Sequence, residues 1–299
     1  GAGYSLFGAY YGAQPDGCVV ESSKPGAASA VPLDEPFARA CRHAPHLARF
    51  IKALSLPLPL TFRLRFNYHR TRQVKEVREA FETEDLIHLI RPVAYDPLRS
   101  IYQGTSPAVC RNSLTKRGEH RDSRLRTVLM ENTAGGLIAR QELGSMLPVM
   151  ALAGCTHGPA GDEETFGMMY GGRVLDLCAS PGSKAMQALE IVGGNGRTKK
   201  KGRVVANDVN QSRLQALLDA VGRSGLPDDL VKRLVTTNHD ASLFPYPKSG
   251  KLFDAVVADV PCSGDGTIRK DSAILPNWSP RTGNALHGLQ LRILMRALE

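Results

Sequence analysis

The chain has 299 residues, of which 42% are hydrophobic and 22% are charged. These values are typical of globular proteins and exclude a disordered or fibrous chain, and the length allows two domains with separate cores. The formal net charge is +9. This excess of Lys and Arg favours a polyanionic partner, because bound phosphates release counterions, although a merely soluble basic protein explains the charge equally well.

The six cysteines predict neither a disulfide framework nor a metal site. They are scattered, and none forms a CxxC pair or a Cys/His pair at the spacing of zinc ligands. We therefore expect a reducing compartment and no bound metal. No apolar run approaches the roughly 20 residues that span a bilayer, so we expect no membrane partner. Because the chain begins with Gly1 and not with Met, we expect a fragment of a longer protein.

The first half of the chain predicts a lead-in followed by a small basic α+β domain. Residues 1–36 are rich in Gly, Ala, Ser and Pro and predict a loose lead-in. The domain covers residues 37–135 and opens with a helix, or a broken pair of helices, over 37–56, which Pro57 and Pro59 end. Helices and strands in alternation indicate the α+β class, and the domain carries more Arg and Lys than Asp and Glu.

Two segments inside this domain have clear periodicity. Residues 60–66 alternate apolar with polar or basic side chains, which predicts a half-exposed strand with Arg63 and Arg65 on its outer face. Residues 70–81 predict an amphipathic helix from apolar residues at helical spacing, namely Val74, Val77 and Phe81.

A basic run lies between residues 111 and 126. Only Glu119 and Asp122 interrupt it, and its six basic members are Arg111, Lys116, Arg117, Arg121, Arg124 and Arg126. Such a run predicts a surface that contacts phosphates, and a solvated polar loop is an equally good interpretation.

Residues 136–299 predict a parallel α/β domain. Apolar residues at helical spacing predict a helix over 136–152 that introduces it, namely Ile138, Leu143, Met146, Leu147 and Met150. Residues 154–172 predict a surface loop, and the basic insert 193–203 predicts a second loop that contacts RNA or is solvated. Apolar strands alternate with helices and indicate a parallel sheet; the strands are expected at 174–177, 203–209, 234–241 and 253–262.

Residues 174–190 predict a strand, a tight loop and a helix, with Pro181 and Gly182 in the loop. The loop backbone and the free N–H groups of the helix would face the crevice at the carboxyl end of the strand, where polar groups of a ligand bind. An ordinary turn is the alternative. The absence of GxGxxG and GxxxxGK[ST] argues against a standard dinucleotide site and a P-loop.

Three carboxylates lie at or just after the ends of the last three predicted strands: Asp208, Asp240 and Asp259. The carboxyl ends of parallel strands line one crevice, so we expect these side chains to lie close together. A single Asp at a strand end is often only a cap or turn former, but three at matching positions indicate a site. Cys262 lies in the Gly-rich run 259–267, where a thiol is better placed for chemistry than a buried lone cysteine.

The motifs DLCASPGSK, ANDVN, NHDAS and DVPCSGDGTIRKD occur in this order. Together they resemble the AdoMet-dependent RNA cytosine-5 methyltransferases of the Nop/Sun type. IARQELGSMLPVMAL and ALHGLQLRILMRALE are similar to the eukaryotic tRNA-modifying branch, and the resemblance covers about residues 60–299. It implies a Rossmann-like class I methyltransferase fold with a doubly wound parallel sheet, S-adenosyl-L-methionine (AdoMet) as cofactor and tRNA as the RNA partner. It also implies nuclear or nucleolar residence, and we expect a monomer.

The resemblance assigns roles to residues. The loop would cradle AdoMet through Cys178, Ala179, Ser180, Pro181, Gly182, Ser183 and Lys184. Asp208 would bind the ribose, Asp240 would meet the adenine, and Asp259 would lie between the cofactor and the target cytosine. In the family the thiolate of a Thr-Cys motif attacks carbon 6 of cytosine, and the Pro-Cys cysteine, here Cys262, assists product release. The target base must be unstacked to reach the pocket.

The sequence departs from the family pattern. It contains no Thr-Cys dipeptide, Ser180 replaces the usual Ala, and four strands are predicted where the family's sheet has seven. A C-terminally truncated enzyme explains the missing parts, because a parallel sheet that ended at its fourth strand would expose an apolar edge. We therefore expect the 299 residues alone to be inactive. The alternatives are a non-catalytic RNA-binding paralogue or scaffold, and an enzyme that uses Cys262 itself as the nucleophile.

Overall fold

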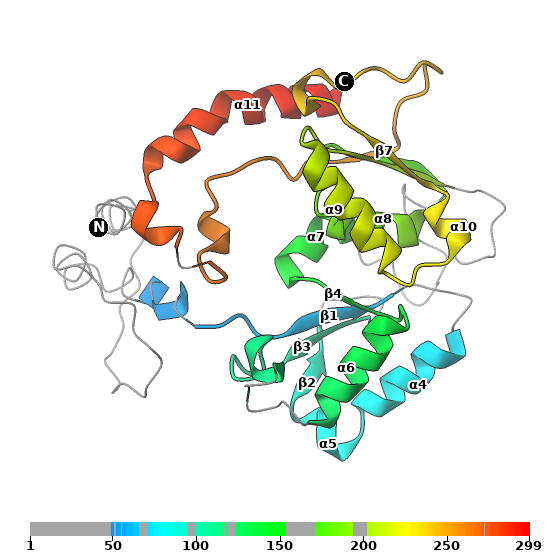
Figure 1. Ribbon diagram of the computed structural model, residues 1–299, viewed down its shortest axis with the longest axis vertical. Helices are drawn as coiled ribbons and strands as arrows, with labels where there is room; N and C mark the ends of the chain where they lie inside the picture. The colour runs from blue at the N-terminus through cyan, green and yellow to red at the C-terminus, as the bar shows by residue number, and fades with distance from the viewer. Residues whose placement is uncertain are drawn as a thin grey trace. The chain divides into compact units, whose positions relative to one another are not determined.

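The computed structural model describes residues 49–50, 52–54, 56–65, 71–94, 100–115, 118, 123–153, 171–193, 202–271 and 273–299. The described residues divide into two compact units. The larger contains residues 59–260 and 291–299, and the smaller contains the described residues up to 58 and residues 261–290. Figure 1 labels many of the helices and strands named below. The expected lead-in lies outside the described residues, as do most of the predicted helix 37–56 and almost all of the loops 154–172 and 193–203.

An antiparallel sheet opens the larger unit, with the strand order β2-β3-β1-β4. Its strands are β1 (Thr61–Leu64), β2 (Ile90–Pro92), β3 (Ile101–Gly104) and β4 (Ile138–Arg140). The helices α4 (Thr71–Phe81), α5 (Glu84–Ile87) and α6 (Arg124–Ala134) and the 3-10 turn η2 (Asn112–Leu114) accompany it. Phe62 and Tyr102 stack with ring centroids 5.6 Å apart, and Phe81 of α4 packs against both. The predicted amphipathic helix over 70–81 is confirmed.

The expected helix over 136–152 is wrong in its first part. Residues 138–140 form β4, which pairs with β1, and the helix α7 begins only at Leu143 and ends at Leu152. Ile138 and Ala139 are both buried, so this short strand lacks the alternation of polar and apolar residues that would distinguish it from a helix. The sheet of the N-terminal module therefore extends past residue 136, and the domain boundaries stay predictions.

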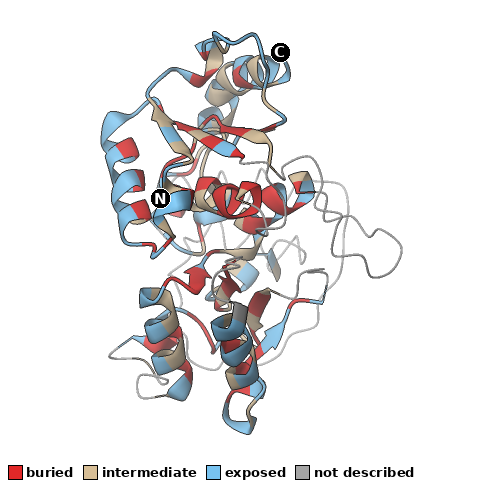
Figure 2. Cartoon of the chain, turned by 90° about the vertical axis from the view of Figure 1, so that its right-hand side faces the viewer, coloured by how far each residue is buried: buried red, intermediate tan, exposed pale blue. Residues whose placement is uncertain are grey.

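Both faces of the antiparallel sheet are covered, and this overturns the expected outer face of 60–66. The face that carries Phe62 packs against α4, α5 and α6. On the opposite face Ile101 packs against α7, and Arg63 and Arg65 are only 5% and 7% exposed. Alternation of apolar and polar residues shows that a strand has two different faces. It does not show whether the polar face meets solvent or is buried against polar groups of another part of the protein. In Figure 2 the strands are accordingly mostly buried, and exposed surface lies on the outer sides of the helices.

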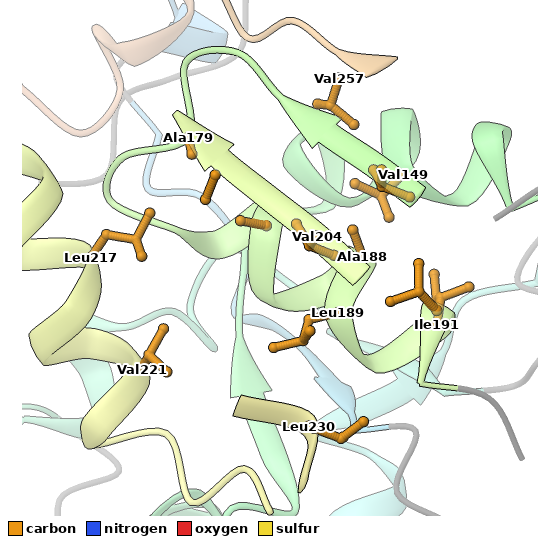
Figure 3. Close-up of a cluster of buried hydrophobic side chains, with 14 of the residues drawn as sticks. Val149, Ala179, Ala188, Leu189, Ile191, Val204, Leu217, Val221, Leu230 and Val257 are labelled. Atoms are coloured by element: carbon orange, nitrogen blue, oxygen red, sulfur yellow. The ribbon is translucent and has the colours of Figure 1, made fainter. Parts of the chain in front are cut away.

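The second sheet of the larger unit is parallel, with the order β7-β6-β5-β8. Its strands are β5 (Arg173–Asp176), β6 (Arg203–Asn207), β7 (Leu234–Thr237) and β8 (Ala255–Val257), and its helices are α8 (Ser183–Val192), α9 (Gln211–Gly222) and α10 (Asp228–Val231). Apolar side chains of the strands and these helices form one core, part of which Figure 3 shows. The four predicted strands and the parallel α/β class are confirmed.

The remaining elements are short turns and a long helix. The 3-10 turn η3 (Ala241–Leu243) follows β7, and η4 (Asp265–Thr267) and η5 (Leu275–Asn277) belong to the smaller unit. There the indole nitrogen of Trp278 donates to Asp265 Oδ1 at 2.8 Å. The helix α11 (Pro280–Leu298) buries a single residue, Ile293. None of the helices in the described part of the chain is long and apolar enough to cross a membrane.

Candidate active site

The loop between β5 and α8 is held tightly against its neighbours. Ala179 N donates to Asn207 O at 2.7 Å, and Gly182 N donates to Ala179 O at 2.7 Å. Gly182 caps α8 with a φ of +105°, a conformation that favours glycine. A Cβ at this position would lie 2.9 Å from Cγ of the fully buried Leu217. The loop therefore requires Gly182 for both its backbone and its packing.

Asp208 follows β6 and fastens this loop to the start of α9. Its Oδ2 accepts from Ser180 N at 3.2 Å and its Oδ1 from Asn210 N at 2.9 Å, and the residue is 2% exposed. Arg213 adds a second tie, because it donates to Ser180 O at 2.6 Å and lies 3.7 Å from Asp208 Oδ2. The predicted proximity of Asp208 to the loop is confirmed, and its contact with a ribose stays a prediction.

Lys184, in the first turn of α8, joins the loop to the carboxylate that follows β8. Its Nζ donates to Asp259 Oδ2 at 2.7 Å and to Ser145 Oγ of α7 at 3.0 Å. The Lys184 side chain is 12% exposed and that of Asp259 is 60% exposed. The structure thus brings two predicted residues into contact and leaves much of the Asp259 carboxylate open to solvent. Sequence reasoning missed Ser145, although it lies within the family-like motif IARQELGSMLPVMAL.

Asp176, the last residue of β5, is a buried carboxylate that sequence reasoning also missed. It is 1% exposed, and no hydrogen bond of ordinary geometry reaches either of its carboxylate oxygens within the described residues, although the backbone N–H of Cys178 is near enough to lower its pKa. Burial raises its pKa to about 7, and the negative charges of Asp259 and Asp208 add to the shift. The Ser180 hydroxyl nearby in the loop is also buried without a partner. These polar atoms fit a ligand that supplies hydrogen-bond donors.

Asp240 makes its hydrogen bonds within its own loop and not with Asp176, Lys184, Asp208 or Asp259 in the described residues. Its Oδ1 accepts from the backbone and the hydroxyl of Ser242, both at 2.8 Å, and these bonds hold its pKa below the usual value. Its contact with an adenine stays a prediction. The neighbouring loops are tied by the buried Asn207, which donates to Leu177 O at 3.0 Å and to His239 O at 2.9 Å. One amide therefore connects the carboxyl ends of β5, β6 and β7.

The two predicted site cysteines have different surroundings. Cys178 is half-buried, and burial together with the charges of Asp176 and Asp208 raises its pKa to about 11, so its thiol is a poor nucleophile. Cys262 is exposed and belongs to the smaller unit, where Gln290 donates to Pro261 O at 2.7 Å. Its role stays a prediction. The described residues hold no group of three or more His, Cys, Asp or Glu arranged for a metal ion.

Comparison with known proteins relates the C-terminal part of the chain to a methyltransferase family. Residues 168–299 match the profile of the family described as 16S rRNA methyltransferase RsmB/F. The matched part of the chain begins just before β5 and contains the loop, Asp208, Lys184 and Asp259.

Similar proteins include tRNA methyltransferases. The chain is 32% identical over 288 residues to the multisite-specific tRNA cytosine-C5 methyltransferase trm4b of Schizosaccharomyces pombe, which covers 84% of the chain and 38% of the relative. It is 37% identical over 182 residues to the tRNA (cytosine(34)-C5) methyltransferase of Drosophila melanogaster, covering 58% and 22%. The chain thus spans less than two fifths of the length of these relatives.

Solved structures support the fold. A methyltransferase homologue from Pyrococcus horikoshii covers 88% of the chain and 65% of its own length, with a TM-score of 0.53 and 20% identity. NSun6 from the same organism covers 88% of the chain and 76% of its own length, with a TM-score of 0.53 and 14% identity. The Rossmann-like class I methyltransferase fold predicted from sequence is confirmed.

Proposed function

We propose that the protein transfers a methyl group from AdoMet to carbon 5 of cytosine in RNA, with tRNA as the substrate. The observation that carries the proposal is the contact between Lys184 and Asp259 beside a loop that Asp208 fastens. This arrangement lies at the carboxyl ends of three neighbouring parallel strands, where ligands of such sheets bind. The match of residues 168–299 to the RsmB/F profile and the named tRNA activities of the relatives support the same reaction.

AdoMet fits the residues that are present. The loop 178–184 would surround the cofactor, Asp208 would serve the ribose, and Asp240 the adenine. The unpartnered oxygens of Asp176 favour a donor such as an ammonium group close to the loop. When bound, AdoMet supplies an electrophilic methyl group.

The protein's own residues orient the target base. Lys184 Nζ donates a hydrogen bond to Oδ2 of Asp259, whereas Oδ1 has no hydrogen-bond partner within the described residues. Oδ1 would therefore accept a hydrogen bond from the cytosine ring. The low exposure of Lys184 fixes its ammonium group, which reduces the freedom of the Asp259 side chain. By the family resemblance Cys262 assists product release, while the attacking thiolate belongs to a Thr-Cys motif.

Methylation of tRNA by the protein expressed from its complete coding sequence tests this proposal. We expect 5-methylcytidine in tRNA after incubation with AdoMet that carries a deuterated methyl group, detected by mass spectrometry of the nucleosides. Asp259→Asn should abolish the product while AdoMet binding persists. Binding of tRNA with no 5-methylcytidine would favour a non-catalytic paralogue. The protein is also tested for covalent capture of RNA that contains 5-fluorocytosine. Capture that is lost in Cys262→Ala, and kept when the cysteine of a Thr-Cys motif downstream of residue 299 is replaced by Ala, would make Cys262 the nucleophile.

Nuclear residence, with the nucleolus as the narrower location, is proposed on the ground of the family resemblance. A monomeric state is proposed as a separate expectation. Fluorescence microscopy of the tagged protein tests the location. Analytical ultracentrifugation tests the oligomeric state, and a dimer at micromolar concentration would contradict the proposal.

A further inference from the structure

Three arginines from separate parts of the N-terminal module lie close to one another. Arg140 ends β4, Arg126 lies in α6, and Arg111 immediately precedes η2. Arg140 pairs with Phe62 across the sheet, so it projects on the face that α4, α5 and α6 cover. Arg140 is exposed, but partial burial lowers its pKa, and the positive charges of Arg111 and Arg126 lower it further. The fold therefore gathers residues that are distant in the sequence into one arginine cluster.

No carboxylate of the described residues forms an ion pair with this cluster, whereas Arg124 in the same helix pairs with Asp85 at 3.0 Å. Arg126 is oriented by a hydrogen bond from its Nε to Leu114 O at 2.9 Å. Like charges held close together raise the free energy of the folded protein. An anion that binds the cluster offsets this cost, and guanidinium groups match the geometry of phosphate oxygens.

The cluster is connected to the candidate active site through α7. Arg140 is followed by Gln141, whose side chain donates to Ser145 O at 3.2 Å and to Gln187 Oε1 at 2.9 Å. Ser145 in turn accepts from Lys184. Five residues separate Arg140 from Ser145, and an extended chain of that length reaches at most about 17 Å. A phosphate held at Arg140 therefore lies within a few nucleotides of a base presented to Asp259.

We propose that Arg111, Arg126 and Arg140 bind backbone phosphates of the substrate RNA beside the target cytosine. The proposal rests on the proposed function for the identity of the substrate, and it adds the surface by which the RNA is positioned. Phosphate contacts fix the register of a nucleic acid without reading its sequence. The cluster adds Arg140 to the basic run of residues 111–126. Arg140 lies outside every run of charged residues in the sequence, so only the fold brings it to the others.

The test compares two double variants that each remove two positive charges. Arg111→Gln/Arg140→Gln disrupts the cluster, and Arg72→Gln/Lys75→Gln removes exposed cations of α4 that pair with Glu76 and Glu79. Binding of a transcribed, unmodified tRNA is measured by fluorescence anisotropy between roughly 50 and 200 mM salt. For the cluster variant we expect at least about tenfold weaker binding and a salt slope smaller by about 2, because each lost phosphate contact lowers the slope by about 1. Arg72→Gln/Lys75→Gln should change the affinity for tRNA less than about twofold, because these two side chains are exposed and already paired with Glu76 and Glu79.

Equal losses in the two double variants, or an unchanged salt slope in the cluster variant, would overturn the inference while leaving the proposed function intact. Absence of tRNA binding by the unsubstituted protein would instead overturn RNA as the substrate. A competition experiment distinguishes RNA from an acidic protein partner. If poly-glutamate displaces tRNA from the unsubstituted protein at an equal concentration of charges, the cluster is not specific for phosphates and the proposal is contradicted. The thermal midpoint of Arg140→Gln gives an independent readout, since a phosphate-binding role predicts no decrease and a structural role predicts a decrease.

Discussion

The buried ion pairs between the two sheets give the sharpest prediction about stability. Arg63 of β1 contacts both carboxylate oxygens of Glu190 in α8, and Arg65 Nη1 lies 3.3 Å from Glu190 Oε1. The Glu190 side chain is fully buried, and the Arg side chains are 6% and 7% exposed. Burial also lowers the pKa of Arg65. Glu190→Ala therefore leaves two buried guanidinium groups without this counterion.

The expected loss follows from the cost of an uncompensated buried charge, which is about 3–5 kcal/mol when one partner of a buried pair is removed. We expect Glu190→Ala to lower the free energy of unfolding by this amount in a urea titration. Glu76→Ala serves as the control, because Glu76 pairs with Arg72 on the exposed surface of α4. An exposed pair of this spacing contributes about 0.3–0.5 kcal/mol.

A triple substitution tests whether charge, and not shape, causes the loss. Arg63→Met/Arg65→Leu/Glu190→Met removes all three charges and keeps apolar volume, so its unfolding free energy should return toward that of the unsubstituted protein. The reasoning is refuted if Glu190→Ala costs no more than Glu76→Ala, or if the triple variant is less stable than Glu190→Ala.

Three further predictions concern the loop and its neighbours. Gly182→Ala should lower stability by about 1–3 kcal/mol and weaken AdoMet binding, whereas Gly222→Ala, whose added Cβ meets nothing within 4 Å, should leave both measurements equal or improved. Asp176 has a folded-state pKa of about 7 against an ordinary value of 3.8, so ionisation costs the folded state up to about 4 kcal/mol as the pH rises through this window. In urea titrations, the free energy of unfolding of Asp176→Asn minus that of the unsubstituted protein should therefore be larger at pH 8 than at pH 4. An equal difference at both pH values would contradict the raised pKa of Asp176. Ser145→Ala should lower kcat for tRNA methylation with little change in the KM for AdoMet, and Ser145→Thr, which keeps the hydroxyl that Lys184 contacts, should restore the rate; equal rates in both would exclude the positioning role.

Sequence reasoning predicted the parallel sheet because each of its strands is a short apolar run between turn or helix signals. The same reasoning placed Asp208 and Asp259 correctly, because parallel strands end on one edge. The rule that found them applies equally to Asp176, the last residue of β5. Asp176 was not predicted as a site residue because it lies within the apolar run of β5, directly before the loop.

The errors have a common physical cause, which is the layer that covers the antiparallel sheet. Arg63 and Arg65 alternate with apolar residues as solvent-facing side chains do, yet Glu190, more than 120 residues later, buries them. Ile138 and Ala139 pair with β1, so their environment also depends on a distant segment. Local periodicity reports the faces of an element and not the partner that each face meets.

Binding of AdoMet to the 299-residue chain, measured by isothermal titration calorimetry, tests the central claim most directly. We predict one site per chain, with affinity at least about tenfold weaker in Asp208→Ala, because loss of the charge-assisted bonds to Ser180 N and Asn210 N releases the loop. Arg72→Gln should bind AdoMet as tightly as the unsubstituted chain. The absence of AdoMet binding by the unsubstituted chain, or equal affinity in Asp208→Ala, would contradict the methyl-donor site.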